Sequence, residues 1–87
     1  MTKKELREQY FKLCRRACKI DKDPDWLQVI TCTNIFAQLI DHPDAERELG
    51  TEVCNLIKRC TKRHRYDTDV MASKLLEEID FFQKEEQ

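Results

Sequence analysis

The side chains that come closest to a reactive pair are those of Cys60 and His64. They lie four residues apart in the sequence, a spacing at which two side chains can touch on one face of a helix. A nucleophilic cysteine also needs a positioned base and donors for an oxyanion, whereas His64 lies in a run of basic residues. Glu77, Glu78 and Asp80 are close in sequence, but a helix would spread them apart. We therefore predict that the protein is not an enzyme.

The five cysteines do not form a metal-binding pattern. Zinc sites use CxxC pairs or clustered cysteine and histidine, whereas three residues separate Cys14 from Cys18 and five separate Cys54 from Cys60. The odd number argues against a complete disulfide framework, and residues 1–4 do not begin a secretory signal. We predict reduced, buried thiols that pack as small hydrophobic side chains, with no metal and no cofactor.

Two short segments are candidates for binding a partner. The first holds Ile20, an apolar residue at a predicted turn, and Asp21, which is free to accept hydrogen bonds if Asp23 caps the next helix. The second is a run of basic or titratable residues: Lys58, Arg59, Lys62, Arg63, His64 and Arg65. If both segments lie at the same end of a helical bundle, they form one pocket with an apolar residue, an acceptor and a cationic rim. The alternative for the first segment is that Ile20 closes the core and Asp21 is merely solvated. The alternative for the second is a solvated loop.

The composition predicts a single all-α domain over residues 1–87. One glycine and two prolines in 87 residues nearly exclude a β-fold, which needs turn residues about every 8–12 positions. The same scarcity excludes a glycine-rich phosphate loop. No apolar run approaches the roughly 20 residues that span a bilayer.

Apolar residues recur at spacings of three and four, which is typical of helices with one buried face. A capping box at Thr2 and Glu5 predicts the start of the first helix. Asp23 and Pro24 predict the start of the second, and Gly50 is expected as the left-handed cap of a short third helix. Thr51 is expected to cap the fourth helix, and Asp67 or Thr68 the fifth. The expected helices cover residues 2–20, 24–40, 43–49, 51–60 and 67–82, with 61–66 poorly periodic and 84–87 frayed.

The second of these helices is apolar around more than half of its circumference, which predicts that it is the central one. Trp26, in its first turn, is expected to anchor the core. The predicted core residues of the first two helices are Leu6, Tyr10, Phe11, Leu13, Cys14, Ala17, Cys18, Ile20, Leu27, Ile30, Cys32, Ile35, Phe36, Leu39 and Ile40.

Three segments together resemble the TFIIS N-terminal domains of transcription-elongation proteins, and most of all the integrase-binding domains of lens epithelium-derived and hepatoma-derived growth factor-related proteins. Residues 6–21 end in the Lys-Ile-Asp of the family's first interhelical loop. A Cys-x-x-Ile-Phe-x-x-Leu helix follows at residues 32–39, then a Thr-x-Val-x-x-Leu-x-Lys-Arg run at residues 51–59. The similarity covers about residues 5–83.

The resemblance implies a compact right-handed bundle of four main helices and one short helix, without enzyme activity. It also implies that the chain is a fragment of a longer protein. It implies a nuclear module that binds short disordered motifs, acidic with aromatic anchors, in transcription and chromatin proteins. Ile20 would line the pocket and Asp21 would accept backbone amides of the ligand. Where the family presents an aromatic and a β-branched residue, this chain has Lys62 and His64. Tyr66 supplies the aromatic if the loop is shifted.

The alternative function is a small helical nucleic-acid-binding domain that uses the basic residues 58–65. A duplex-binding domain usually carries a large positive net charge, because its cations release counterions from the phosphates. The net charge of this chain is −1. We therefore expect peptide motifs, and neither nucleic acid nor membrane, as partners.

Overall fold

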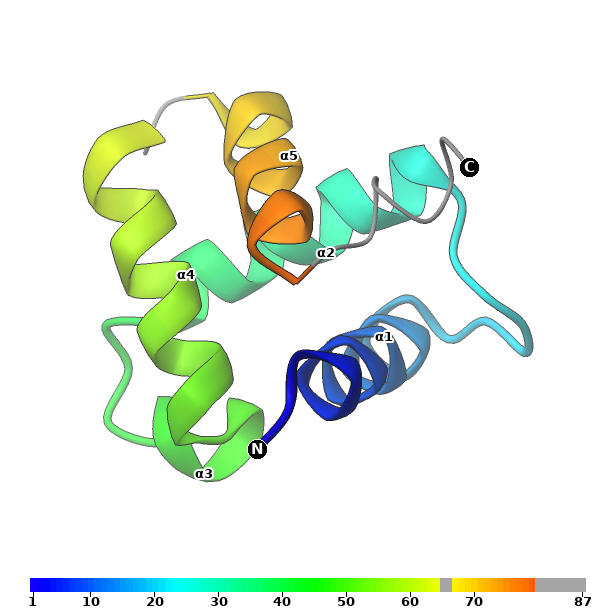
Figure 1. Cartoon of the computed structure of the whole chain (residues 1–87), viewed down its shortest axis with the longest axis horizontal. Helices are drawn as coiled ribbons and strands as arrows, with labels where there is room; N and C mark the ends of the chain where they lie inside the picture. The colour runs from blue at the N-terminus through cyan, green and yellow to red at the C-terminus, as the bar shows by residue number, and fades with distance from the viewer. Residues whose placement is uncertain (65–66, 80–87) are drawn as a thin grey trace.

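The computed structural model describes residues 1–64 and 67–79, and every regular element in these ranges is a helix (Figure 1). The helices are α1 (Lys3–Cys18), α2 (Trp26–Leu39), α3 (Ala45–Leu49), α4 (Thr51–His64) and α5 (Thr68–Glu78). The prediction of an all-α bundle with four main helices and one short helix is confirmed for this part of the chain. The predicted continuation of the last helix to Phe82 and the fraying of residues 84–87 lie outside the described residues.

Helix α2 lies at the centre of the bundle, as the sequence predicts. It contacts α1, α4 and α5, and Figure 1 shows it running across the molecule above α1. In the middle of α2, Phe36 is only 2% exposed and packs edge-on against the ring of Tyr10, with centroids 5.9 Å apart. The Tyr10 hydroxyl donates to the hydroxyl of Thr33, which donates to the carbonyl of Val29 at 2.8 Å. The buried hydroxyls of Tyr10 and Thr33 are therefore both hydrogen-bonded.

Two residues of the predicted core face solvent instead. Ala17 is exposed near the end of α1, and Leu27 in the first turn of α2 is 74% exposed. Trp26 packs against the core, as predicted. Because adjacent side chains on a helix point about 100° apart, the rotation that buries Trp26 turns Leu27 outward.

The start of α2 differs from the prediction. Asp25 is the N-cap: its carboxylate accepts from the amide of Gln28 at 2.9 Å, while the Gln28 side chain accepts from the amide of Asp25 at 3.0 Å. This reciprocal pair satisfies two backbone donors at once. The predicted cap, Asp23, instead forms an ion pair with Arg15 at 2.9 Å. Asp21 is nevertheless exposed and has no hydrogen-bond or ion-pair partner among the described residues.

Helix α1 begins and ends with defined caps. The Thr2 hydroxyl accepts from the amide of Glu5 at 3.1 Å, as predicted. Lys19 directly follows the helix in the left-handed conformation (φ 55°, ψ 51°), and the amides of Lys19 and Ile20 both donate to the carbonyl of Arg15. These two bonds hold a lysine in a conformation that non-glycine residues rarely adopt. They thereby fix the direction in which the α1–α2 link leaves the bundle.

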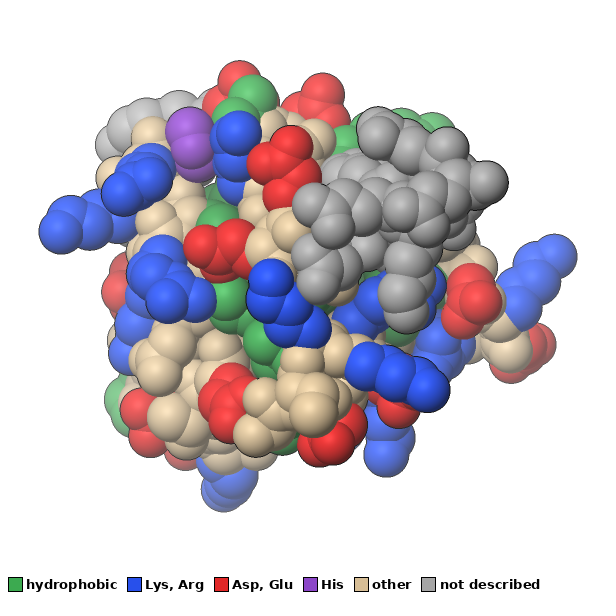
Figure 2. Space-filling model, viewed as in Figure 1, with side chains coloured by type: hydrophobic (Ala, Val, Ile, Leu, Met, Phe, Trp, Pro, Cys, Tyr) green, Lys and Arg blue, Asp and Glu red, His purple; other side chains and the backbone are tan. Residues whose placement is uncertain are grey.

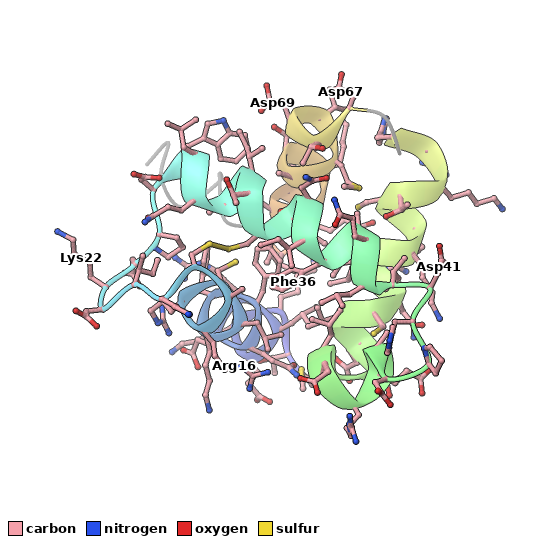
Figure 3. All side chains as sticks on the ribbon, turned by 180° about the vertical axis from the view of Figure 1, so that it is seen from behind. Arg16, Lys22, Phe36, Asp41, Asp67 and Asp69 are labelled. Carbon is pink, nitrogen blue, oxygen red and sulfur yellow. A yellow bond between two sulfur atoms is a disulfide. The ribbon has the colours of Figure 1, made fainter. Side chains whose placement is uncertain are left out.

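The prediction that all cysteines are reduced is wrong for one pair. Cys18, at the end of α1, and Cys32, in α2, form a disulfide, which Figure 3 shows as a yellow bond between the two helices. Cys14, Cys54 and Cys60 are buried free thiols, as predicted. The sequence could not reveal the pair, because it depends on how α1 and α2 pack.

Gly50 joins α3 to α4 in a conformation that glycine alone adopts readily. Its φ of +83° is positive, but its ψ of 150° places it outside the left-handed helical region, so the prediction of a left-handed cap is wrong. A Cβ atom here would lie 2.6 Å from Nε2 of Gln9. Thr51 is the first residue of α4 rather than its cap, since the Gly50 carbonyl accepts from the amide of Cys54 at 3.0 Å. Asp67 caps α5, as one of the two predicted alternatives.

Candidate functional site

The basic residues after Cys60 are helical. We predicted that α4 would end near Cys60, because its apolar periodicity stops there, but the helix continues to His64. Lys62, Arg63 and His64 form its last turn, where positive charge interacts favourably with the exposed carbonyls of the helix end. These side chains are therefore attached to a rigid element and not to a loop.

The last turns of α4 lie beside α5, and side chains of both helices line an open groove of about 810 Å³. It is lined by Arg59, Cys60, Lys62, Arg63, His64, Lys74, Glu77 and Glu78. We call it the α4–α5 groove. Figure 2 shows Lys, Arg and His side chains at the upper left of this face, beside Asp and Glu side chains nearer its centre.

The two walls of the α4–α5 groove differ in charge. The α4 wall carries Arg59, Lys62 and Arg63, all cationic, whereas the α5 wall carries Lys74 with Glu77 and Glu78. Nη2 of Arg59 lies 3.4 Å from Oε2 of Glu78, which joins the two helices, and Nζ of Lys74 lies 3.3 Å from Oε2 of Glu77 on the same helix.

Two cations of the α4–α5 groove are unpaired. Lys62 and Arg63 are exposed and make no hydrogen bond or ion pair with any residue of 1–64 or 67–79. Because they project from one helical turn, the backbone sets the two points at which their side chains are attached. Both cations are open to solvent.

Cys60 is the sulfur-bearing member of the α4–α5 groove. Its burial, and after that the negative charge of Glu78, raises the pKa of the Cys60 thiol to about 11. Near neutral pH the group is therefore a protonated thiol, whereas a nucleophilic cysteine needs a lowered pKa. Because of this raised pKa, Cys60 does not supply a thiolate nucleophile to a Cys60–His64 pair near neutral pH.

Four of the predicted partner-binding residues line the α4–α5 groove: Arg59, Lys62, Arg63 and His64. Lys58 is exposed on α4 but outside the lining, and Arg65 and Tyr66 lie outside the described residues. Ile20, half-buried, and Asp21, exposed, lie in the link between α1 and α2.

The interpretation of both segments as one pocket is wrong. Figure 1 shows the α1–α2 link at the right edge and the end of α4 at the upper left, and Figure 3, from behind, again shows Lys22 of the link far from the end of α4. The interpretation assumed helices that run up and down beside one another. Instead α2 crosses the molecule and carries the chain from one end to the other.

The α5 wall was not predicted from the sequence. Lys74, Glu77 and Glu78 have the spacing i, i+3 and i+4, which predicts a shared helical face. That spacing does not reveal which neighbouring helix the face meets. The contact with α4 follows only from the packing of the two helices.

No family model matches the chain, and no curated protein or solved structure matches it. Within the described residues, no group of three or more His, Cys, Asp or Glu side chains is placed to hold a metal ion. No helix in the same part of the chain is long and apolar enough to cross a membrane.

Proposed function

We propose that the protein is a protein–protein interaction module of the nucleus that binds short, disordered, acidic segments with an aromatic anchor in the α4–α5 groove. The observation that carries the proposal is the unpaired cations Lys62 and Arg63 on the rim of an open groove. The resemblance to TFIIS N-terminal domains supports partners among transcription and chromatin proteins.

The dimensions and charge of the groove suit such a segment. Its volume of about 810 Å³ lies within the roughly 300–1,000 Å³ of typical ligand sites, which is enough for an aromatic side chain with its neighbours. Carboxylates of the segment would meet Lys62 and Arg63 without first breaking an ion pair. Such rim charges act mainly by accelerating association.

Nucleic-acid binding is the second candidate, because the α4 wall is cationic. The α5 wall argues against it, since Glu77 and Glu78 would face the phosphates, and the net charge of −1 gives little release of counterions. A duplex-binding domain would lose affinity for DNA steeply as salt rises, whereas we expect only weak binding of duplex DNA at any salt concentration.

Ile20 and Asp21 lie outside the proposed groove. The Asp21 carboxylate is exposed and free of described partners, so that it stays a predicted acceptor for a ligand. Such a contact belongs to a separate surface at the other end of the bundle, and the proposal for the α4–α5 groove does not depend on it.

Reversing the two free cations tests the proposal. The double variant Lys62→Glu, Arg63→Glu should bind a labelled synthetic peptide of Asp, Glu and one central Phe, about ten residues long, at least about tenfold more weakly than the wild type. Association should be slower and less dependent on salt. Stopped-flow fluorescence at several salt concentrations measures both quantities.

The matched control is Lys4→Glu, Lys12→Glu, which makes the same change of net charge at two exposed residues of α1. We expect an affinity within about twofold of the wild type, because the effect of an exposed charge is screened beyond roughly 10 Å. Equal losses in both double variants would mean that the peptide responds only to net charge, and the groove would not be the site.

A further inference from the structure

We infer that Glu78 is an internal competitor in the α4–α5 groove: its carboxylate occupies Arg59 in the free domain, and a carboxylate of the partner must take its place. The inference rests on the proposed function and specifies how the groove selects its ligand. Two features carry it: the ion pair that joins the two walls, and the position of Glu78 inside the lining.

Glu78 is placed as a ligand carboxylate would be. Its Oε2 lies 3.4 Å from Nη2 of Arg59, across the groove from α5 to α4. Its charge also acts at the lining itself, because it contributes, after burial, to the raised pKa of the Cys60 thiol. Arg59 is thus the one cation of the α4 wall that an acidic side chain of the described chain already occupies.

The ion pair is of a kind that exchanges readily. The side chains of Arg59 and Glu78 are 65% and 45% exposed, and ion pairs in such surroundings contribute little to stability. A partner carboxylate can therefore replace Glu78 at little cost in folding, whereas a buried pair would close this position permanently. Glu77 is not equivalent, since Lys74 on its own helix neutralises it at 3.3 Å.

Because of this exchange, tight binding requires that one carboxylate of the ligand lies beside Arg59. A peptide with carboxylates only near Lys62 and Arg63 leaves the Arg59–Glu78 pair closed and meets the negative charge of Glu78. A peptide with a further carboxylate beside Arg59 restores the lost ion pair. Selectivity then follows from the spacing of the acidic residues and not from their number alone.

Glu78→Gln tests the inference, because it keeps the size of the side chain and removes its charge. We expect it to bind the acidic peptide about threefold to tenfold more tightly than the wild type does, since Arg59 is released and a repulsive charge is removed. The matched control is Glu48→Gln. Glu48 is also an exposed glutamate whose Oε2 lies 3.4 Å from an arginine Nη2, that of Arg16, and it is not part of the groove lining. The affinity of Glu48→Gln for the acidic peptide should stay within about twofold of the wild-type value.

A double-mutant cycle separates competition from simple repulsion. In an Arg59→Gln background, Glu78→Gln should lose most of its gain in affinity, because no ion pair is left to release. If Glu78→Gln still raises the peptide affinity by the full amount in the Arg59→Gln background, Glu78 only repels the peptide. If Glu78→Gln and Glu48→Gln bind the peptide with equal affinity, Glu78 has no local role in the groove. Both results would overturn the inference.

The results also distinguish this inference from the proposed function. Binding by the wild type with no effect of Glu78→Gln contradicts the inference and leaves the proposed function intact. Binding by Glu78→Gln without detectable binding by the wild type supports the inference and contradicts the proposed function for this peptide. If neither protein binds, both proposals are wrong. Thermal unfolding followed by circular dichroism should show that all variants melt within a few degrees of the wild type.

Discussion

Replacing Phe36 with alanine should lower the free energy of unfolding by about 3–5 kcal/mol, as large-to-small changes in packed cores do. Phe36 is 2% exposed in the middle of α2, the helix that contacts α1, α4 and α5, and Figure 3 shows it inside the bundle. The substitution removes the edge-on contact with Tyr10 and leaves a cavity that three helices cannot close together. Urea unfolding followed by circular dichroism measures the loss.

Leu27→Ala is the control for Phe36→Ala, because it removes a large apolar side chain from the same helix at an exposed position. Leu27 is 74% exposed, so that its truncation should change the free energy of unfolding by about 0.5 kcal/mol or less. If the two variants lost equal stability, Phe36 would not be the centre of the core and the packing of α2 would be wrong.

The second large effect is expected at alkaline pH. Burial raises the pKa of the Cys14 thiol from 9.0 to about 12, and burial together with the charge of Glu78 raises that of Cys60 from 9.0 to about 11. Burial also raises the pKa of the Tyr10 hydroxyl well above its usual value. Each group thus favours its neutral form in the folded state. The resulting stability is complete below pH 9 and is lost as the pH rises through 11 and 12, because the unfolded chain gives up its protons first.

Ionisation of these two thiols in the unfolded chain should lower the free energy of unfolding at pH 11 by roughly 3–5 kcal/mol relative to its value at pH 7. That is comparable with the whole stability of a small domain. The measurement is the free energy of unfolding by urea at a series of pH values from 7 to 11. Cys60→Ala should lose less stability over this range than the wild type does, each compared with its own value at pH 7. A wild-type stability that stays constant to pH 11 would contradict the burial of these groups.

The starts and ends of helices were predictable where a cap depends on neighbouring residues alone. The Thr2 and Glu5 box is an example, because both partners lie within one turn. The start of α2 was misplaced since Asp23 and Asp25 are both good caps, and only the return bond from Gln28 decides between them. The end of α4 was misplaced because apolar periodicity reports burial, whereas an exposed last turn can remain helical.

The binding site was only half predictable. Its α4 wall comes from one contiguous basic segment that composition reveals, although Arg65 and Tyr66 of that segment lie outside the described residues. The α5 wall and the separation of Asp21 from Lys62 depend on how α2 crosses the bundle and on how α5 meets α4. Those are long-range packing relations, which the spacing of residues along one helix does not determine.

The most direct test of the central claim is to map the peptide on the protein. The ¹⁵N-labelled domain is titrated with the unlabelled acidic peptide, and the shifts of the backbone amides are followed by NMR. We expect the largest shifts in residues 59–64 and 74–78, on both walls of the α4–α5 groove, and only small shifts in residues 19–25. Largest shifts in residues 19–25, or shifts confined to one wall of the groove, would contradict the central claim.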